Sequence, residues 1–119
     1  HPICSGIPKS FSITDEAYLY PILEKSVTPI LCSDFDFENY SNFYSAGLAM
    51  RGQMNSNVSW THPKGSNLVA WVRKEKSSPI AYIQLGDGPS AYTDSNFRKL
   101  VNNAIDWVSS EEARNWVNS

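Results

Sequence analysis

PIAYIQLGDGPSAYTDSNFRKLVNNAIDWV, residues 79–108, is the stretch that decides the fold. It begins with residues 79–85, a run of strand length in which successive side chains alternate between two faces. The sequence Gly86-Asp87-Gly88-Pro89 then predicts a tight loop. From residue 95 to residue 108, apolar side chains recur 3, 4, 7, 8 and 11 positions after Phe97, which is the period of an amphipathic helix that Asp94 or Ser95 can cap. A strand, a loop and a helix in this order are typical of an α/β protein.

The flanking segments extend this pattern. Residues 67–73 alternate in the same way, so we expect them to form a hairpin with residues 79–85. An apolar run at residues 27–32 predicts a further strand, which Pro29 places at an edge or a bulge, and residues 11–14 predict a weaker one. The spacing of Ser109 and Glu112 is that of a capping box and predicts a second, short helix. Residues 33–59 have no sustained period, and we interpret them as a long insertion with a short helix near residues 41–50.

The composition excludes several classes of protein. The 119 residues are 41% hydrophobic and 18% charged, which fits one globular domain with a real core. The net charge is −2 and the densest basic cluster is only Arg73, Lys74 and Lys76, which disfavours nucleic acid and polyanionic membranes as partners. Cys4 and Cys32 are too few for a disulfide framework, and we expect free thiols rather than a bridge. No signal peptide is visible, which favours a cytoplasmic over an exported location while leaving the location open.

Three blocks of the sequence share an order and spacing with a known family. The first is residues 1–8, HPICSGIP, followed by Asp15-Glu16-Ala17-Tyr18; the second is LVAW at residues 68–71. The third is YIQLGDGP at residues 82–89, followed by NAIDW at residues 103–107. Together they resemble the ThuA-like (trehalose-utilisation) domains over nearly the whole chain except the insertion. The resemblance implies an α/β, flavodoxin-like domain with the three layers of the class I glutamine amidotransferase-like fold, of which residues 1–119 would be the C-terminal portion.

The same resemblance implies a role in carbohydrate catabolism. A ThuA-like protein would act on a small-molecule sugar, either trehalose or a 3-keto sugar, although the resemblance does not specify the reaction. The alternative is a non-catalytic carbohydrate-binding or assembly module that retains the fold. Asp87 stands where the family usually has His, which favours the alternative. Half of a doubly wound sheet would also leave an open edge and an uncovered apolar face, so we expect either a second copy or the missing N-terminal half as a partner.

His1, Asp15 and Glu16 are the candidate catalytic residues. Histidine and carboxylates perform general acid–base chemistry near neutral pH and also bind divalent metals. The loop at Gly86 follows a strand, where α/β sheets bind ligands, and the resemblance implies that the segments of His1 and of Asp15-Glu16 lie near that edge, so we expect the catalytic residues beside this loop. The expected substrate-binding residues are Tyr18, Gly86, Asp87 and Tyr92. Three carboxylates in one place would require a cation or a protonated His1, which makes a divalent metal a candidate cofactor.

Structural roles are open for the same residues. His1 could hydrogen-bond a loop, Asp15 could cap a turn, and the Gly86–Gly88 loop could be only a tight turn. Four rings could stack on sugars but could equally be core anchors: Trp60, His62, Trp71 and Tyr92. Trp107 and Trp116 lie on the predicted helices and are expected to pack. Neither cysteine has the strand-to-helix elbow of an amidotransferase nucleophile, and nothing beyond His1 and His62 suggests a copper site.

Overall fold

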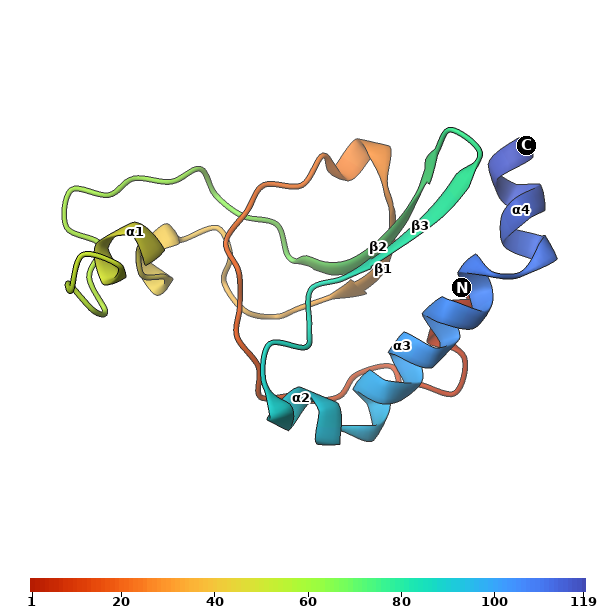
Figure 1. Cartoon of the computed structure of the whole chain (residues 1–119), viewed down its shortest axis with the longest axis horizontal. Coiled ribbons are helices and arrows are strands. Elements are labelled where there is room, and N and C mark those ends of the chain that lie inside the picture. Colours follow the sequence, from red (N-terminus) through yellow and green to blue (C-terminus); the bar gives the residue numbers. More distant parts are fainter.

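Three antiparallel strands form the sheet on which the rest of the chain is built. The computed structural model describes residues 1–119 and places β1 (Thr28–Cys32), β2 (Leu68–Glu75) and β3 (Ser78–Ile83) in the spatial order β1-β2-β3. Both neighbouring pairs are antiparallel (Figure 1). The predicted strands at 27–32, 67–73 and 79–85 are confirmed within two residues, and so is the mixed α/β class. Residues 11–14 form no strand, and this chain contains no parallel pair of the kind that a flavodoxin-like sheet requires.

The hairpin and the edge strand follow their local sequence. Glu75 pairs with Ser78, so only two residues make the turn, and Lys76 takes the positive φ of 54° that such turns need. Pro29 lies inside β1, where its missing N–H weakens the ladder. The pairing of β1 with β2 shifts register between Pro29 and Leu31, and again between Leu31 and Cys32. The prediction that Pro29 marks an edge or a bulge is therefore confirmed, since β1 is an edge strand and its pairing is irregular.

Two helices follow the sheet at the C-terminal end of the chain. α3 (Ser95–Val108) is capped by the Asp94 side chain, which accepts hydrogen bonds from the amides of Asn96 and Phe97, each at 2.8 Å. α4 (Glu111–Asn118) begins one residue later than the capping box predicted, because Ser110 accepts from the Ala113 amide at 3.1 Å. The other helical segments are short: η1 (Pro2–Cys4), η2 (Glu24–Ser26), η3 (Tyr40–Asn42), α1 (Ala46–Ala49) and α2 (Pro89–Thr93).

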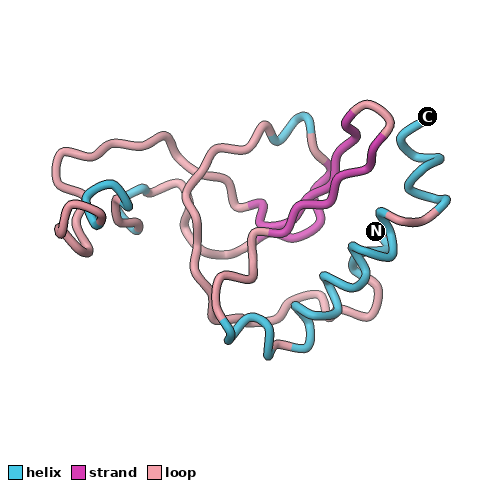
Figure 2. Tube along the Cα trace, in the orientation of Figure 1, coloured by secondary structure: helices cyan, strands magenta, loops and turns pink.

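The core has one cluster on each side of the sheet. The larger cluster joins η1, β2, α3 and α4 and contains Ile3, Val72, Leu100, Ala104, Trp107 and Ala113. The smaller one joins Val69 of β2 to Phe37 and Phe43 of the insertion, which extends away from the sheet as a set of loops (Figure 2). Residues 69 and 72 point to opposite faces because side chains alternate along a strand. The expected short helix in the insertion is present as α1.

One edge of the sheet is open and apolar. β3 has a neighbour on only one side, and between it and α3 runs a groove of about 490 Å³. Ten of the 11 residues that line this groove are hydrophobic, including Ile83, Phe97 and the 57% exposed Ile105. The radius of gyration is 16.3 Å, against about 13.5 Å for a compact domain of this length. The uncovered apolar surface expected from the sequence is therefore present. No helix is both long and apolar enough to cross a bilayer.

Candidate functional site

The segment 14–18 lies directly against the loop that leaves β3. The Ser90 hydroxyl donates to the Thr14 carbonyl at 3.2 Å, and the Gln84 amide donates to the Tyr18 carbonyl at 2.9 Å. Gln84 is itself buried. The two segments are about 70 residues apart in the sequence, so these hydrogen bonds bring together two of the blocks that carry the family resemblance.

Asp15 fixes the conformation of this loop. One carboxylate oxygen accepts from the Gly86 amide at 2.7 Å, and the other accepts from the Asp87 amide at 3.2 Å and from the Glu16 amide at 2.9 Å. Backbone N–H groups that are left without a partner on folding cost free energy, and a carboxylate is a strong acceptor for them. Because both oxygens are engaged, Asp15 positions the loop and has little capacity left for a ligand.

Tyr18 bridges two other carboxylates. Its hydroxyl lies 2.8 Å from Glu16 Oε2 and also hydrogen-bonds Asp87 Oδ1. These bonds, that to Asp87 first and that to Glu16 second, raise the pKa of the Tyr18 hydroxyl above its ordinary value. A hydroxyl has one proton and can donate to only one of the two carboxylates at a time. The other carboxylate therefore keeps an unused acceptor on an exposed surface, where a ligand hydroxyl could donate to it.

Gly86 and Tyr92 complete the loop. Gly86 has a φ of +115°, a region that side chains disfavour. A Cβ at this position would lie 3.0 Å from Phe97 Cζ and 3.3 Å from the Tyr92 hydroxyl oxygen, so the close packing also requires glycine. The ring of Tyr92 packs edge-on against Phe97 at 5.2 Å, and the residue is 58% exposed. The structure thus brings Asp15, Glu16, Tyr18, Gly86, Asp87 and Tyr92 together, as the sequence led us to expect.

His1 does not join this cluster. Its ring packs edge-on against Trp107, with centroids 4.6 Å apart, and its Nδ1 accepts from the Ile3 amide as the cap of η1. Trp107 is ten residues along α3 from Phe97, which contacts the Gly86 loop, so about 15 Å of helix separates the two ends. The expectation that His1 and the Asp15–Glu16 pair line one face is therefore wrong. His1 takes the alternative role of a loop-capping residue.

A cleft of about 810 Å³ opens beside Asp15, Glu16 and Tyr18. Two chain segments line it, residues 13–19 and residues 33–62, and we call these its first and second walls; the second wall includes Trp60 and His62, which the sequence offers as candidate sugar-stacking rings. Asp34 and Tyr44 also lie on this second wall and are not among the predicted site residues, although the density of Asp, Asn and aromatic residues in the insertion was a signal for them. Trp71 lies elsewhere, stacked on Tyr82 at 4.8 Å, and is a packing residue of the sheet.

The charged groups of the cluster are arranged without a metal centre. No group of three or more His, Cys, Asp or Glu side chains is placed to hold a metal ion. Asp15 is satisfied by backbone N–H groups, and the Tyr18 hydroxyl lies between Glu16 and Asp87. Hydrogen-bond donors thus lie where we expect, from the sequence, either a cation or a protonated His1. Both cysteines are free, and the Cys4 thiol donates to the Ile30 carbonyl at 3.6 Å.

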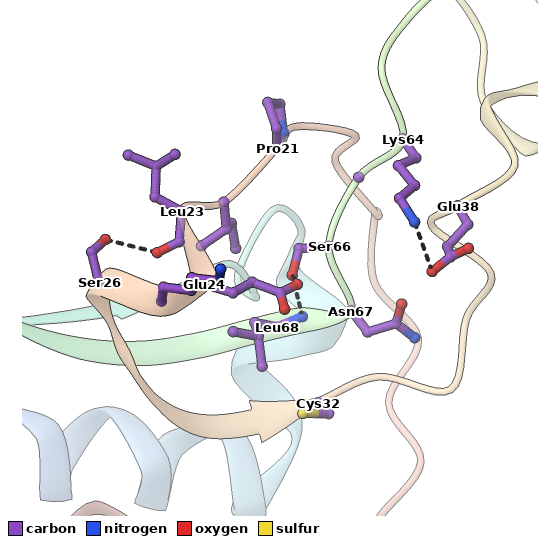
Figure 3. Close-up of a pocket in the computed structure, with 13 residues that line it drawn as sticks. Pro21, Leu23, Glu24, Ser26, Cys32, Glu38, Lys64, Ser66, Asn67 and Leu68 are labelled. Atoms are coloured by element: carbon purple, nitrogen blue, oxygen red, sulfur yellow. Dashed lines mark hydrogen bonds and ion pairs between the residues drawn. The ribbon is translucent and has the colours of Figure 1, made fainter.

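A second hollow, of about 880 Å³, lies where residues 21–26 meet the start of β2 (Figure 3). Its acidic side chains already have partners: Glu24 accepts from the Ser66 hydroxyl at 2.6 Å, and Glu38 pairs with Lys64 at 3.4 Å. Cys32 lies at its rim, at the end of β1 (Figure 3). None of the candidate site residues lines this hollow, so the cleft beside Asp15 remains the candidate site.

Comparison with known proteins agrees with the resemblance seen in the sequence. Residues 1–108 match the model of the ThuA family, which is described as trehalose utilisation. This stretch includes all three sequence blocks, the insertion and α3. No curated protein and no solved structure matches the chain.

Proposed function

We propose that the chain binds a sugar from the catabolism of trehalose or of 3-keto sugars, in the cleft beside Asp15. The premise is that the chain belongs to the ThuA family of trehalose utilisation over residues 1–108. The observation that carries the proposal is the composition of the two walls. One wall offers the acceptors Glu16 and Tyr18, and the other offers the rings of Trp60 and His62. Carboxylates accept from sugar hydroxyls, while aromatic faces cover the apolar C–H groups of a sugar ring. The cleft volume of about 810 Å³ lies within the range of about 300–1,000 Å³ that is usual for ligand pockets.

The residues of the cluster would have different roles in sugar binding. Asp15 holds the Gly86–Asp87 loop in place through its backbone bonds. Glu16 and Asp87 share the Tyr18 hydroxyl, so a sugar hydroxyl would donate to whichever carboxylate that hydroxyl leaves free. A carbohydrate would thus meet a preorganised set of acceptors on a loop that Asp15 already anchors.

An enzyme of the same pathway is the second candidate. Glu16 is an exposed carboxylate on the first wall of the cleft, and the imidazole of His62 lies on the second, so one acid–base group is available from each wall. The prior engagement of Asp15 and the remote position of His1 weigh against the catalytic trio expected from the sequence. Binding is therefore the function that the geometry supports best.

We propose further that the chain is the C-terminal portion of a larger domain with a flavodoxin-like, glutamine amidotransferase-like fold. Three observations support this. The edge of β3 and its apolar groove are uncovered, the radius of gyration is large for the chain length, and Trp71 Nε1 is buried without a hydrogen-bond partner. Buried polar groups are nearly always satisfied in complete domains. Additional strands beside β3 would supply what these features lack.

Titration calorimetry with trehalose and with a 3-keto disaccharide tests the binding proposal. We expect saturable binding that weakens at least fivefold in the Glu16→Gln and Trp60→Ala variants. Glu111→Gln is the matched control, because Glu111 is an exposed acid on α4 that is remote from the cleft. Wild-type protein that binds neither sugar, or binding that Glu16→Gln and Trp60→Ala leave unchanged, would overturn the proposal. Turnover of the bound sugar, lost in Glu16→Gln, would favour the enzyme instead.

A further inference from the structure

His62 stands at the point where the insertion returns to the sheet, four residues before the buried Ser66 that precedes β2. Its ring lies 5.5 Å from that of Trp60, which in turn packs edge-on against Tyr40 at 5.9 Å. Trp60 also packs against the buried cluster of Phe37, Phe43 and Val69. The imidazole is therefore held by a wall that is anchored in the core, although the insertion has little regular structure.

The backbone fixes which ring nitrogen carries the proton. His62 Nδ1 lies 2.7 Å from the carbonyl oxygen of Pro63. A carbonyl oxygen can only accept, so Nδ1 must be the donor in this contact. In the neutral imidazole, Nε2 then has a free lone pair and no hydrogen. Because the N–H at Nδ1 is bound to the backbone, the neutral ring offers its surroundings only one hydrogen-bonding group, the acceptor Nε2.

From this geometry we infer that Nε2 of His62 is the acceptor for a sugar hydroxyl at the second wall of the cleft, and that it selects ligands that donate hydroxyls to both walls. This inference rests on the proposed function. The carboxylates of Asp15, Glu16 and Asp34 and the hydroxyls of Tyr18 and Tyr44 line the same cleft. Asp34 and Tyr44 lie on the same wall as His62, whereas the ring of Trp60 can cover a sugar face but cannot accept from its hydroxyls. His62, whose ring lies 5.5 Å from that of Trp60, thus supplies an acceptor directly beside this aromatic face.

Two substitutions of His62 test the roles of its two ring nitrogens separately. The amide of Asn lies near the position of Nδ1 and can still donate to the Pro63 carbonyl, whereas the amide of Gln reaches the position of Nε2 and can accept from a ligand. We expect His62→Asn to weaken trehalose binding roughly threefold to tenfold, the effect of one lost hydrogen bond. His62→Gln should retain affinity within about twofold of wild type. His1→Gln is the control, because His1 packs on Trp107 outside the cleft.

A proton–nitrogen correlation spectrum of the imidazoles tests the protonation state without any ligand. The chain has two histidines, so the His1→Gln variant leaves only the signals of His62. We expect a protonated Nδ1 and an unprotonated Nε2 in the neutral ring. The opposite tautomer, or equal trehalose affinity of wild type and His62→Asn, would overturn the inference while leaving sugar binding intact. Failure of wild type to bind any sugar would instead refute the proposed function and the inference with it.

Discussion

Replacing Asp15 by Asn tests whether this residue anchors the loop that leaves β3. The change keeps the size of the side chain but removes its charge and one of its two acceptor oxygens. The carboxylate accepts two long-range hydrogen bonds, from the amides of Gly86 and Asp87, and one local bond from the Glu16 amide. A hydrogen bond to a charged group contributes about 1.5–3 kcal/mol, and the amide group can replace only part of this. Because Asp15 is half-buried, we expect Asp15→Asn to lower the free energy of unfolding by about 2 kcal/mol.

Urea denaturation followed by circular dichroism measures this loss, which corresponds to a melting temperature about 8 °C lower for a chain of this length. Glu16→Gln is the matched control, since it makes the same chemical change one residue later. Glu16 is exposed, and its carboxylate accepts only from the Tyr18 hydroxyl, so the control should cost less than about 0.5 kcal/mol. If Asp15→Asn proves as stable as Glu16→Gln, Asp15 does not anchor the loop, and its role must be sought in the cleft itself.

Three further predictions concern Tyr18, Tyr20 and the open edge. The hydrogen bond to Asp87 is the first cause of the raised pKa of Tyr18, so Asp87→Asn should make one phenol ionise at lower pH in an absorbance titration. Asp106→Asn, which changes an exposed residue of α3, should have no such effect. If neither variant changes the titration, the Tyr18 hydroxyl does not bridge Glu16 and Asp87. Burial first, and the hydrogen bond to Tyr82 second, raise the pKa of the Tyr20 hydroxyl. The neutral hydroxyl should therefore contribute its full stabilisation of the fold below about pH 10, the ordinary pKa of tyrosine, and this stabilisation should be lost as the pH rises further. Wild-type protein should self-associate in sedimentation through the groove beside β3, and Ile105→Asp should reduce this more than Val58→Asp, which changes an even more exposed residue of the insertion. A monomer at all concentrations would show that the edge needs no partner.

The elements that the sequence predicted well are those whose signal is local. The apolar period from Phe97 located α3 to the residue, and alternation located the hairpin of β2 and β3, because side-chain spacing directly reflects helix and strand geometry. The contact of Asp15 with Gly86 joins positions 71 residues apart, and only the order of the family blocks suggested it. No periodic pattern contains such information.

The misplacement of His1 has a physical cause. The N-terminal segment runs along α3, where the Asn103 amide donates to the carbonyls of Ile3 and Ser5, each at 2.9 Å. Ile3 is 1% exposed, so burial of this one side chain draws the segment toward the far end of the helix. Similarly, the insertion forms a wall of the cleft because Phe37 and Phe43 reach a core cluster, and their irregular spacing gave no sign of it.

The contacts of Ile3 also bear on the order in which the molecule can form. Ile3 shares its cluster with Leu100, Trp107 and Ala113, so its side chain can be buried only after residues as distant along the chain as Ala113 have been synthesised. Asp15 likewise waits for Gly86. Pairings between such distant positions slow folding because a long loop must close before any contact forms. During synthesis the segment around Ile3 therefore stays exposed until α3 and α4 have emerged, and a chaperone that covers apolar segments would find it accessible while the residues in between are made.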